Sequence, residues 1–131
     1  MAMTAHVVFS ALDPAHPATT SATIIQQVIR GVIGFQGLLM SDDVSMNALS
    51  GSIAERTRAI LAAGCDMVLH CNGKLDEMRE VASETPELSG EALARARRAL
   101  SSRKAPRAFD RLAARAELDA LVERARTAAG V

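Results

Sequence analysis

The chain has 131 residues, no net formal charge and a hydrophobic content of 49%, which suits one domain with a sizeable core. Aromatic residues make up only 2%, with no Trp or Tyr, so the core must be aliphatic and a base-stacking nucleic-acid surface is disfavoured. No stretch reaches the roughly 18 apolar residues of a membrane helix. Met1 to Ser10 lacks the basic start and long apolar run of a targeting segment. We therefore expect neither a nucleic-acid nor a membrane partner.

The charges are unevenly distributed along the chain. Residues 1–90 carry ten acidic and five basic groups, and residues 91–131 carry five acidic and ten basic groups. The arginines of the second part are interleaved with Glu and Asp, which favours a solvated helical tail, docked on an acidic body, over a nucleic-acid-binding tail.

The two cysteines, Cys65 and Cys71, flank one predicted strand. Six extended residues span about 20 Å, far beyond the ~7 Å limit for a disulfide. We interpret them as buried or free thiols in a reducing cytosol, which predicts a cytoplasmic location. Their spacing is not that of a zinc site, which disfavours a metal site at the cysteines.

The first half of the chain predicts two strands separated by a helix. Residues 5–10 form an apolar run typical of a buried strand, and a Pro-rich loop follows. Ile and Val residues then recur every three or four positions over 21–33, which predicts an amphipathic helix that ends at Gly34. Residues 37–41 form the second predicted strand, which leads into Asp42 and Asp43.

The second half continues the alternation of strands and helices. Ser52 and Glu55 form a capping box that starts a helix over 52–63. A strand over 66–71, a helix over 74–84 and a helix from Ser89 to Leu100 follow, and helical spacing returns from Phe109 to near Thr127. Strands that alternate with helices predict a parallel sheet with right-handed crossovers. Its first and third strands would leave unpaired edges, which favours self-association.

Asp42 and Asp43 are the first candidate site. Side chains alternate along a strand, so Leu38, Met40 and Asp42 share one face, and Asp43 lies on the other. An acid at the carboxyl end of a buried strand is where α/β enzymes commonly keep their chemistry. Solvated turn residues are the alternative, since Asp is common in turns. The pattern alone leaves both interpretations open.

The segments Gly34-Phe35-x-Gly37 and Ser41-Asp42-Asp43-Val44-Ser45-Met46 resemble the nucleophile segment of bacterial β-N-acetylhexosaminidases, in the family-three glycoside hydrolases. The resemblance extends to Met3–Val7 and to Ala62–Leu69, and it covers roughly residues 2 to 100. It implies an α/β fold made of the last three β/α units of a (β/α)8 (TIM-type) barrel, followed by carboxyl-terminal helices. Residues 1–104 would be a partial catalytic domain, and residues 105–131 a carboxyl-terminal helix.

The resemblance also implies an activity, namely retaining hydrolysis of terminal β-linked N-acetylhexosamine residues with Asp42 as the nucleophile. The substrate would be a saccharide that contains N-acetylglucosamine, such as a cell-wall fragment in peptidoglycan recycling. The resemblance implies no metal or organic cofactor. The family's acid is a His-Asp pair on a Lys-His-Phe-Pro-Gly-His-Gly segment, which this sequence lacks. We therefore expect the isolated chain to be inactive.

Five other side chains have open roles. His6 stands at the family's Thr-Ala-His position, which implies substrate binding, although a lone strand histidine is usually a core residue. Met46 would line the sugar pocket or simply pack. His70 is a weaker pocket candidate, and His16 is expected to be solvated. Asp43 is interpreted as a structural acid that accepts main-chain hydrogen bonds.

Two other classes of function compete with the glycosidase. A phospho-accepting receiver domain also carries an Asp pair at a strand end, but it needs acids on another strand and a Lys at a later strand end. The first predicted strand has no acid, and no Lys follows the third strand before Lys74, so this class is disfavoured. A non-catalytic remnant that binds partners through its sheet edges or basic tail stays open.

Overall fold

The computed structural model describes residues 1–130. Its strands and helices follow one another as β1 (Ala2–Met3), a 3₁₀ turn η1 (Ala18–Thr20), a π-helix η2 (Thr23–Val32), β2 (Leu39–Asp43), α1 (Ile53–Ala63), β3 (Met67–Leu69), α2 (Leu75–Glu84), α3 (Gly90–Ser101) and α4 (Arg111–Ala129).

The three strands form one parallel sheet in the order β1-β2-β3. Met40 in the middle strand is paired with Met3 of β1 on one side and with Met67 of β3 on the other. The predicted parallel α/β arrangement is therefore confirmed. Each connection between neighbouring strands runs through helix, as a parallel pair requires.

The first predicted strand, residues 5–10, is wrong. The strand lies earlier, at Ala2–Met3, and residues 5–10 form a loop in which Val7, Val8 and Phe9 are 51%, 49% and 48% exposed. Main-chain pairing explains the position: the N–H of Thr4 still donates to the carbonyl of Met40 at 2.9 Å. The chain then bends at His6 and leaves the sheet.

The helix predicted over 21–33 exists at Thr23–Val32, but it is a π-helix. Its wider turns close i→i+5 hydrogen bonds, such as that from the N–H of Ile33 to the carbonyl of Val28 at 2.8 Å. Gly34 follows with φ of +69°, a left-handed conformation in which a side chain would be strained. This residue turns the chain toward β2.

Helix α1 begins and ends within one residue of the predicted range 52–63. Ser52 and Glu55 form the predicted capping box, in which the Ser52 hydroxyl accepts from the Glu55 N–H and the Glu55 carboxylate accepts from the Ser52 N–H. Gly64 ends the helix with φ of +111°. The predicted third strand, 66–71, is shorter in the structure, at Met67–Leu69, and α2 matches its predicted range 74–84 closely.

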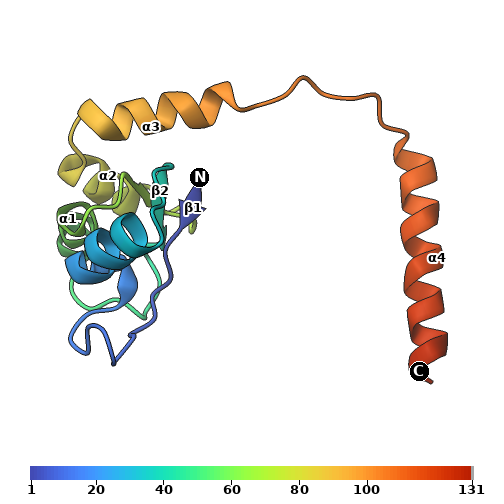
Figure 1. The fold of residues 1–131 in the computed structure, drawn as a ribbon, viewed down its shortest axis with the longest axis horizontal. Helices are drawn as coiled ribbons and strands as arrows, with labels where there is room; N and C mark the ends of the chain where they lie inside the picture. The colour runs from blue at the N-terminus through green and yellow to red at the C-terminus, as the bar shows by residue number, and fades with distance from the viewer. Residues whose placement is uncertain (131) are drawn as a thin grey trace.

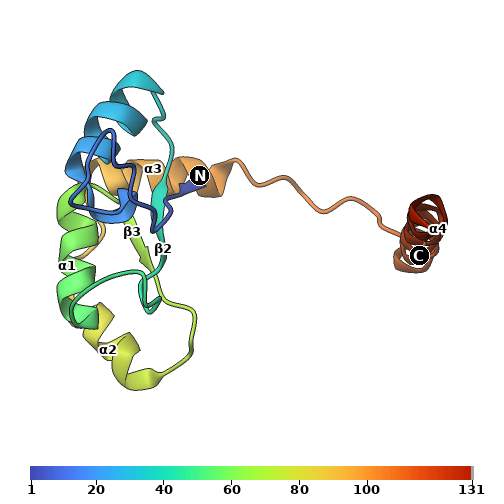
Figure 2. The same ribbon diagram turned by 90° about the horizontal axis from the view of Figure 1, so that it is seen from below.

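The core lies on one face of the sheet. Helices α1, α2 and η2 gather on that side (Figures 1 and 2), and Leu39 of β2 is 1% exposed against them. The members of the buried cluster are Ile25, Leu39, Val44, Leu49, Ile60, Ala63 and Cys65. On the opposite face, Met3 and Met67 are 51% and 38% exposed. The described residues thus build one layer of helices against one face.

Asp66 anchors helix α3 and η2 to the sheet. Its Oδ2 atom accepts from the Leu39 N–H at 2.8 Å and from the Arg30 guanidinium at 2.9 Å, and its Oδ1 atom accepts from Arg95 at 2.8 Å. Arg30 also donates to the carbonyl of Gly37 at 2.7 Å. One carboxylate, with a side chain only 4% exposed, therefore joins β2, η2 and α3.

Helix α4 stands apart from this body, at the end of an extended segment that follows α3 (Figure 1). Asp110 caps its start by accepting from the N–H groups of Leu112 and Ala113, both at 3.0 Å. No hydrogen bond or ion pair joins α4, or its capping residues Asp110 and Gly130, to residues 1–109. None of the helices in this range is long and apolar enough to span a membrane.

Candidate active site

The two acids lie inside β2, at its carboxyl end. The strand runs over Leu39–Asp43, so it ends two residues later than the predicted range 37–41. Leu39 and Ser41 are 1% and 0% exposed, whereas Met40 and Asp42 are half-buried. Asp42 thus shares the half-buried environment of Met40, and the pairing of β2 with β3 is irregular between Met40 and Asp43.

The carboxylate of Asp42 makes few contacts. Its Oδ1 atom accepts from the N–H of Asp43 at 2.8 Å, which fixes the orientation of the side chain. Within residues 1–130, the structure records no other hydrogen bond or ion pair to this carboxylate. One oxygen of Asp42 is thus left for a group from outside the described chain.

Asp43, by contrast, is held by its neighbours. Its carboxylate accepts from the Ser45 N–H at 3.0 Å, from the Ser45 hydroxyl at 2.8 Å and from the Cys71 N–H at 3.3 Å. Burial raises the pKa of Asp43, but these hydrogen bonds and the nearby His70 outweigh burial and leave the pKa below its ordinary value. This is the structural acid that the sequence predicted.

His6 links the loop after β1 to the end of β2. Its Nδ1 atom lies 2.8 Å from the Thr19 hydroxyl, and its Nε2 atom lies 2.9 Å from the main-chain carbonyl of Asp43. The Thr4 hydroxyl donates to the Thr19 hydroxyl at 2.9 Å. Both ring nitrogens therefore have protein partners, and the imidazole positions the strand end that bears Asp42. Substrate binding by His6 stays a prediction.

His70 faces the start of α2. Its Nε2 atom lies 3.0 Å from Glu77, which also accepts from Asn72 at 2.5 Å and from Lys74 at 3.1 Å. The hydrogen bond from His70, followed by those from Asn72 and Lys74, lowers the pKa of Glu77 to about 2. With its side chain 7% exposed, His70 fixes the loop after β3.

The loop after β2 carries Met46, which is 42% exposed. Its N–H donates to the carbonyl of Asp43 at 3.1 Å, and Arg56 donates to the carbonyls of Val44 and Met46, both at 3.1 Å. The loop is therefore held from α1, with the Met46 side chain accessible. His16 lies on the surface beside Asp13, 58% exposed, as predicted.

Thr4 and Thr19 were missed by sequence reasoning. They are 6% and 0% exposed and form the buried end of the His6 hydrogen-bond chain. No local pattern marks them, because the two hydroxyls meet across 15 residues of sequence.

Both cysteines are free: Cys65 is buried, which raises its pKa to about 11, and Cys71 is exposed. Over residues 1–130, no group of three or more His, Cys, Asp or Glu is placed to hold a metal.

Together, the parallel sheet and its covering helices define an α/β protein, and the half-buried carboxylate at a strand end is its candidate site. Residues 1–101 match the Glycosyl hydrolase family 3 N terminal domain. The chain belongs to this family.

Several relatives are named beta-hexosaminidase. The protein of Alkalilimnicola ehrlichii is 50% identical over 72 residues, which are 53% of this chain and 20% of that protein. The protein of Idiomarina loihiensis is 36% identical over 105 residues, which are 79% of this chain and 32% of that protein. The chain thus spans between a fifth and a third of the length of these relatives.

Two solved structures of beta-N-acetylglucosaminidases are also similar to this chain. A glycoside hydrolase family 3 beta-N-acetylglucosaminidase from Paenibacillus sp. superposes with a TM-score of 0.63 and 26% identity, over 83% of this chain and 24% of that one. The beta-N-acetylglucosaminidase from Thermotoga maritima gives a TM-score of 0.60 and 33% identity, over 78% and 25%. The family match lends no support to the receiver-domain alternative.

Proposed function

We propose that this chain carries the nucleophile-bearing part of a β-N-acetylhexosaminidase active site, with Asp42 as the nucleophile. One observation carries the proposal: Asp42 lies at the carboxyl end of the central strand, half-buried, with one carboxylate oxygen that makes no hydrogen bond within residues 1–130. The names of the relatives supply the substrate class, a saccharide with a terminal β-linked N-acetylhexosamine.

The proposed chemistry uses the carboxylate of Asp42, which has one oxygen without a hydrogen bond within residues 1–130. An oxygen of Asp42 attacks the anomeric carbon, a new carbon–oxygen bond forms, and the bond to the leaving oxygen breaks. The leaving oxygen takes a proton from an acid. Water then cleaves the glycosyl ester, which restores Asp42 and retains the anomeric configuration.

Asp43 positions this nucleophile. Its own carboxylate is committed to Ser45 and Cys71, and its N–H holds Oδ1 of Asp42. The strand end is further fixed by His6 through the carbonyl of Asp43. We place His6 and Met46 on the substrate side of the site: His6 supports the strand end, and Met46 offers an exposed apolar surface to the sugar.

Neither Asp43 nor His6 supplies the general acid that this mechanism needs. Asp43 is held by three hydrogen bonds, and both nitrogens of His6 are occupied, so neither group is free to protonate a leaving oxygen. General acid catalysis is worth roughly 10²–10⁴-fold. We therefore propose that residues 1–131 alone show no measurable hydrolysis of an aryl N-acetylglucosaminide.

The test uses a hybrid in which residues 1–101 replace the matching segment of the Idiomarina loihiensis beta-hexosaminidase. We expect the hybrid to hydrolyse an aryl N-acetylglucosaminide, and Asp42→Ala to reduce its turnover by several orders of magnitude. The control is Asp76→Ala on α2, whose side chain is 93% exposed and which should leave turnover unchanged. Near-normal turnover of the Asp42→Ala hybrid would show that the nucleophile lies elsewhere.

A further inference from the structure

Helix α4 lies beyond the part of the chain that matches the family, residues 1–101, and it has no role in the site described above. One of its faces is apolar. Residues three, four and seven positions apart meet on one side of a helix, and this spacing gathers a row of apolar side chains, here named the α4 stripe. The stripe consists of Ala114, Leu118, Leu121, Val122 and Ala125.

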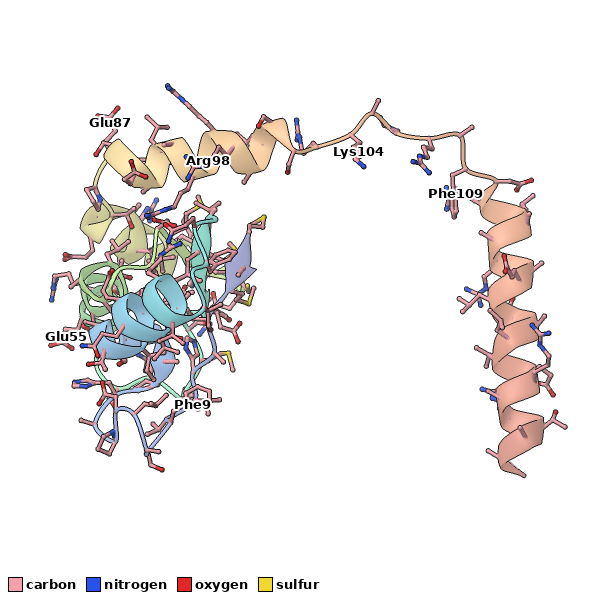
Figure 3. The ribbon with its side chains drawn as sticks, viewed as in Figure 1. Phe9, Glu55, Glu87, Arg98, Lys104 and Phe109 are labelled. Atoms are coloured by element: carbon pink, nitrogen blue, oxygen red, sulfur yellow. The ribbon has the colours of Figure 1, made fainter. Side chains whose placement is uncertain are left out.

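The α4 stripe is exposed. Leu118, Leu121 and Val122 are 53%, 49% and 41% exposed, and the side chains of α4 project into open space around the helix (Figure 3). Most of the stability of a helix in a protein comes from packing its apolar face, and α4 has no buried residue among its 19. The stripe therefore favours an α4 that is packed against a partner helix.

The order of side chains in the stripe suits an antiparallel copy of itself. When two α4 helices cross antiparallel, with the midpoint between Leu118 and Leu121 as their centre, Leu118 of each copy meets Leu121 of the other. In the same register, Ala114 meets Ala125, and these small residues allow the helices to approach closely. Two leucine layers are thus enclosed by two alanine layers.

The charges beside the stripe select the same register. Glu117 and Arg124 are seven residues apart, so they lie on the same flank of the stripe. In the antiparallel pair, Glu117 of one copy comes opposite Arg124 of the other, and this contact occurs twice. Within residues 1–130, neither side chain takes part in an ion pair, whereas Arg115 is engaged by Asp119 at 3.0 Å. A parallel pair would not bring Glu117 to Arg124.

We propose that α4 is a dimerisation helix, which pairs antiparallel with α4 of a second copy of this chain through the α4 stripe and two reciprocal Glu117–Arg124 ion pairs. The interface is separate from the Asp42 site, so it stands or falls independently of the proposed catalytic function.

The test is a charge exchange read by sedimentation equilibrium of the full chain over a concentration series. Glu117→Arg and Arg124→Glu each place like charges opposite one another twice, and each should raise the dissociation constant about tenfold or more. The double variant restores opposite charges with the wild-type composition, and its dissociation constant should return to within about threefold of the wild-type value. Leu121→Glu should abolish the dimer, and Leu112→Glu, outside the stripe and 84% exposed, should not.

Three outcomes would overturn the proposal. The first is a wild-type chain that stays monomeric, whether α4 is solvated or folds back onto its own body. The second is a dimer that both single charge variants leave unchanged, which would point to the open sheet edges of β1 and β3 instead. The third is a double variant as weak as the single ones. Circular dichroism of each variant confirms that its helix content is retained.

Discussion

The Nε2 atom of His6 lies 2.9 Å from the main-chain carbonyl oxygen of Asp43, so one imidazole joins the loop after β1 to the end of β2. A carbonyl oxygen only accepts hydrogen bonds, so Nε2 carries the proton in this arrangement. In the neutral imidazole, Nδ1 is then the acceptor for the Thr19 hydroxyl, whose oxygen lies 2.8 Å away. A directed chain of hydrogen bonds results, from Thr4 through Thr19 and His6 to the strand end that holds Asp42.

This geometry predicts the cost of removing the ring nitrogens. His6→Phe keeps an aromatic ring but leaves the buried Thr19 hydroxyl without its acceptor, and it should lower the free energy of unfolding by about 1–3 kcal/mol. Urea denaturation followed by circular dichroism measures the change. The matched control is His16→Phe, at a surface position, which should have little effect. Equal stability of the wild-type and His6→Phe chains would contradict the hydrogen-bond chain.

Local signals in the sequence predicted the helices better than the strands. The Ser52–Glu55 capping box and Gly64 placed α1 within one residue, because both ends are determined by neighbouring residues. The first strand was misplaced, because its position depends on pairing with Leu39 and Met40, which no local pattern records. An apolar run at Val7–Phe9 resembled a strand but lies half-exposed in a loop.

In the candidate site too, local sequence patterns identified some features and missed others. Asp42 and Asp43 could be found from their position after an apolar strand, and the structural role of Asp43 followed from its place on the other face. The contacts of His6 with Thr19, and of Asp66 with Arg95, join residues 13 and 29 positions apart. Such long-range contacts depend on the tertiary fold and leave no spacing signal in the chain.

Asp66 should be one of the most sensitive positions for stability. Asp66→Asn keeps the shape of the side chain but removes the charge that Arg30 and Arg95 share, and those side chains are only 9% and 17% exposed. Removing one partner of a buried ion pair typically costs about 3–5 kcal/mol. Urea unfolding of the chain should show a loss of this order. The control is Asp76→Asn, an exposed carboxylate on α2, and a similar small change in both variants would refute the anchoring role of Asp66.

The lowered pKa of Glu77 predicts how the stability of the chain changes in acid. Its folded pKa of about 2 lies below the ordinary 4.5, so the ionised carboxylate favours the folded state. That contribution is fully present above about pH 4.5 and is lost as the pH falls toward 2. Between these values, Glu77→Gln should therefore lose less stability than the wild-type chain. Denaturation curves at several pH values measure the difference, with Glu80→Gln on the exposed side of α2 as the control. Parallel pH profiles for wild type and Glu77→Gln would contradict the assignment.

The central claim, that Asp42 is the nucleophile, is tested most directly by trapping the covalent intermediate. The hybrid enzyme with residues 1–101 is treated with a fluorinated N-acetylglucosaminyl substrate that forms its glycosyl ester quickly and releases it slowly, and the labelled peptide is sequenced by mass spectrometry. We predict one sugar per active site, attached to Asp42, and no label in the Asp42→Ala hybrid. A label on Asp43, or a label that persists in the Asp42→Ala hybrid, would contradict the account.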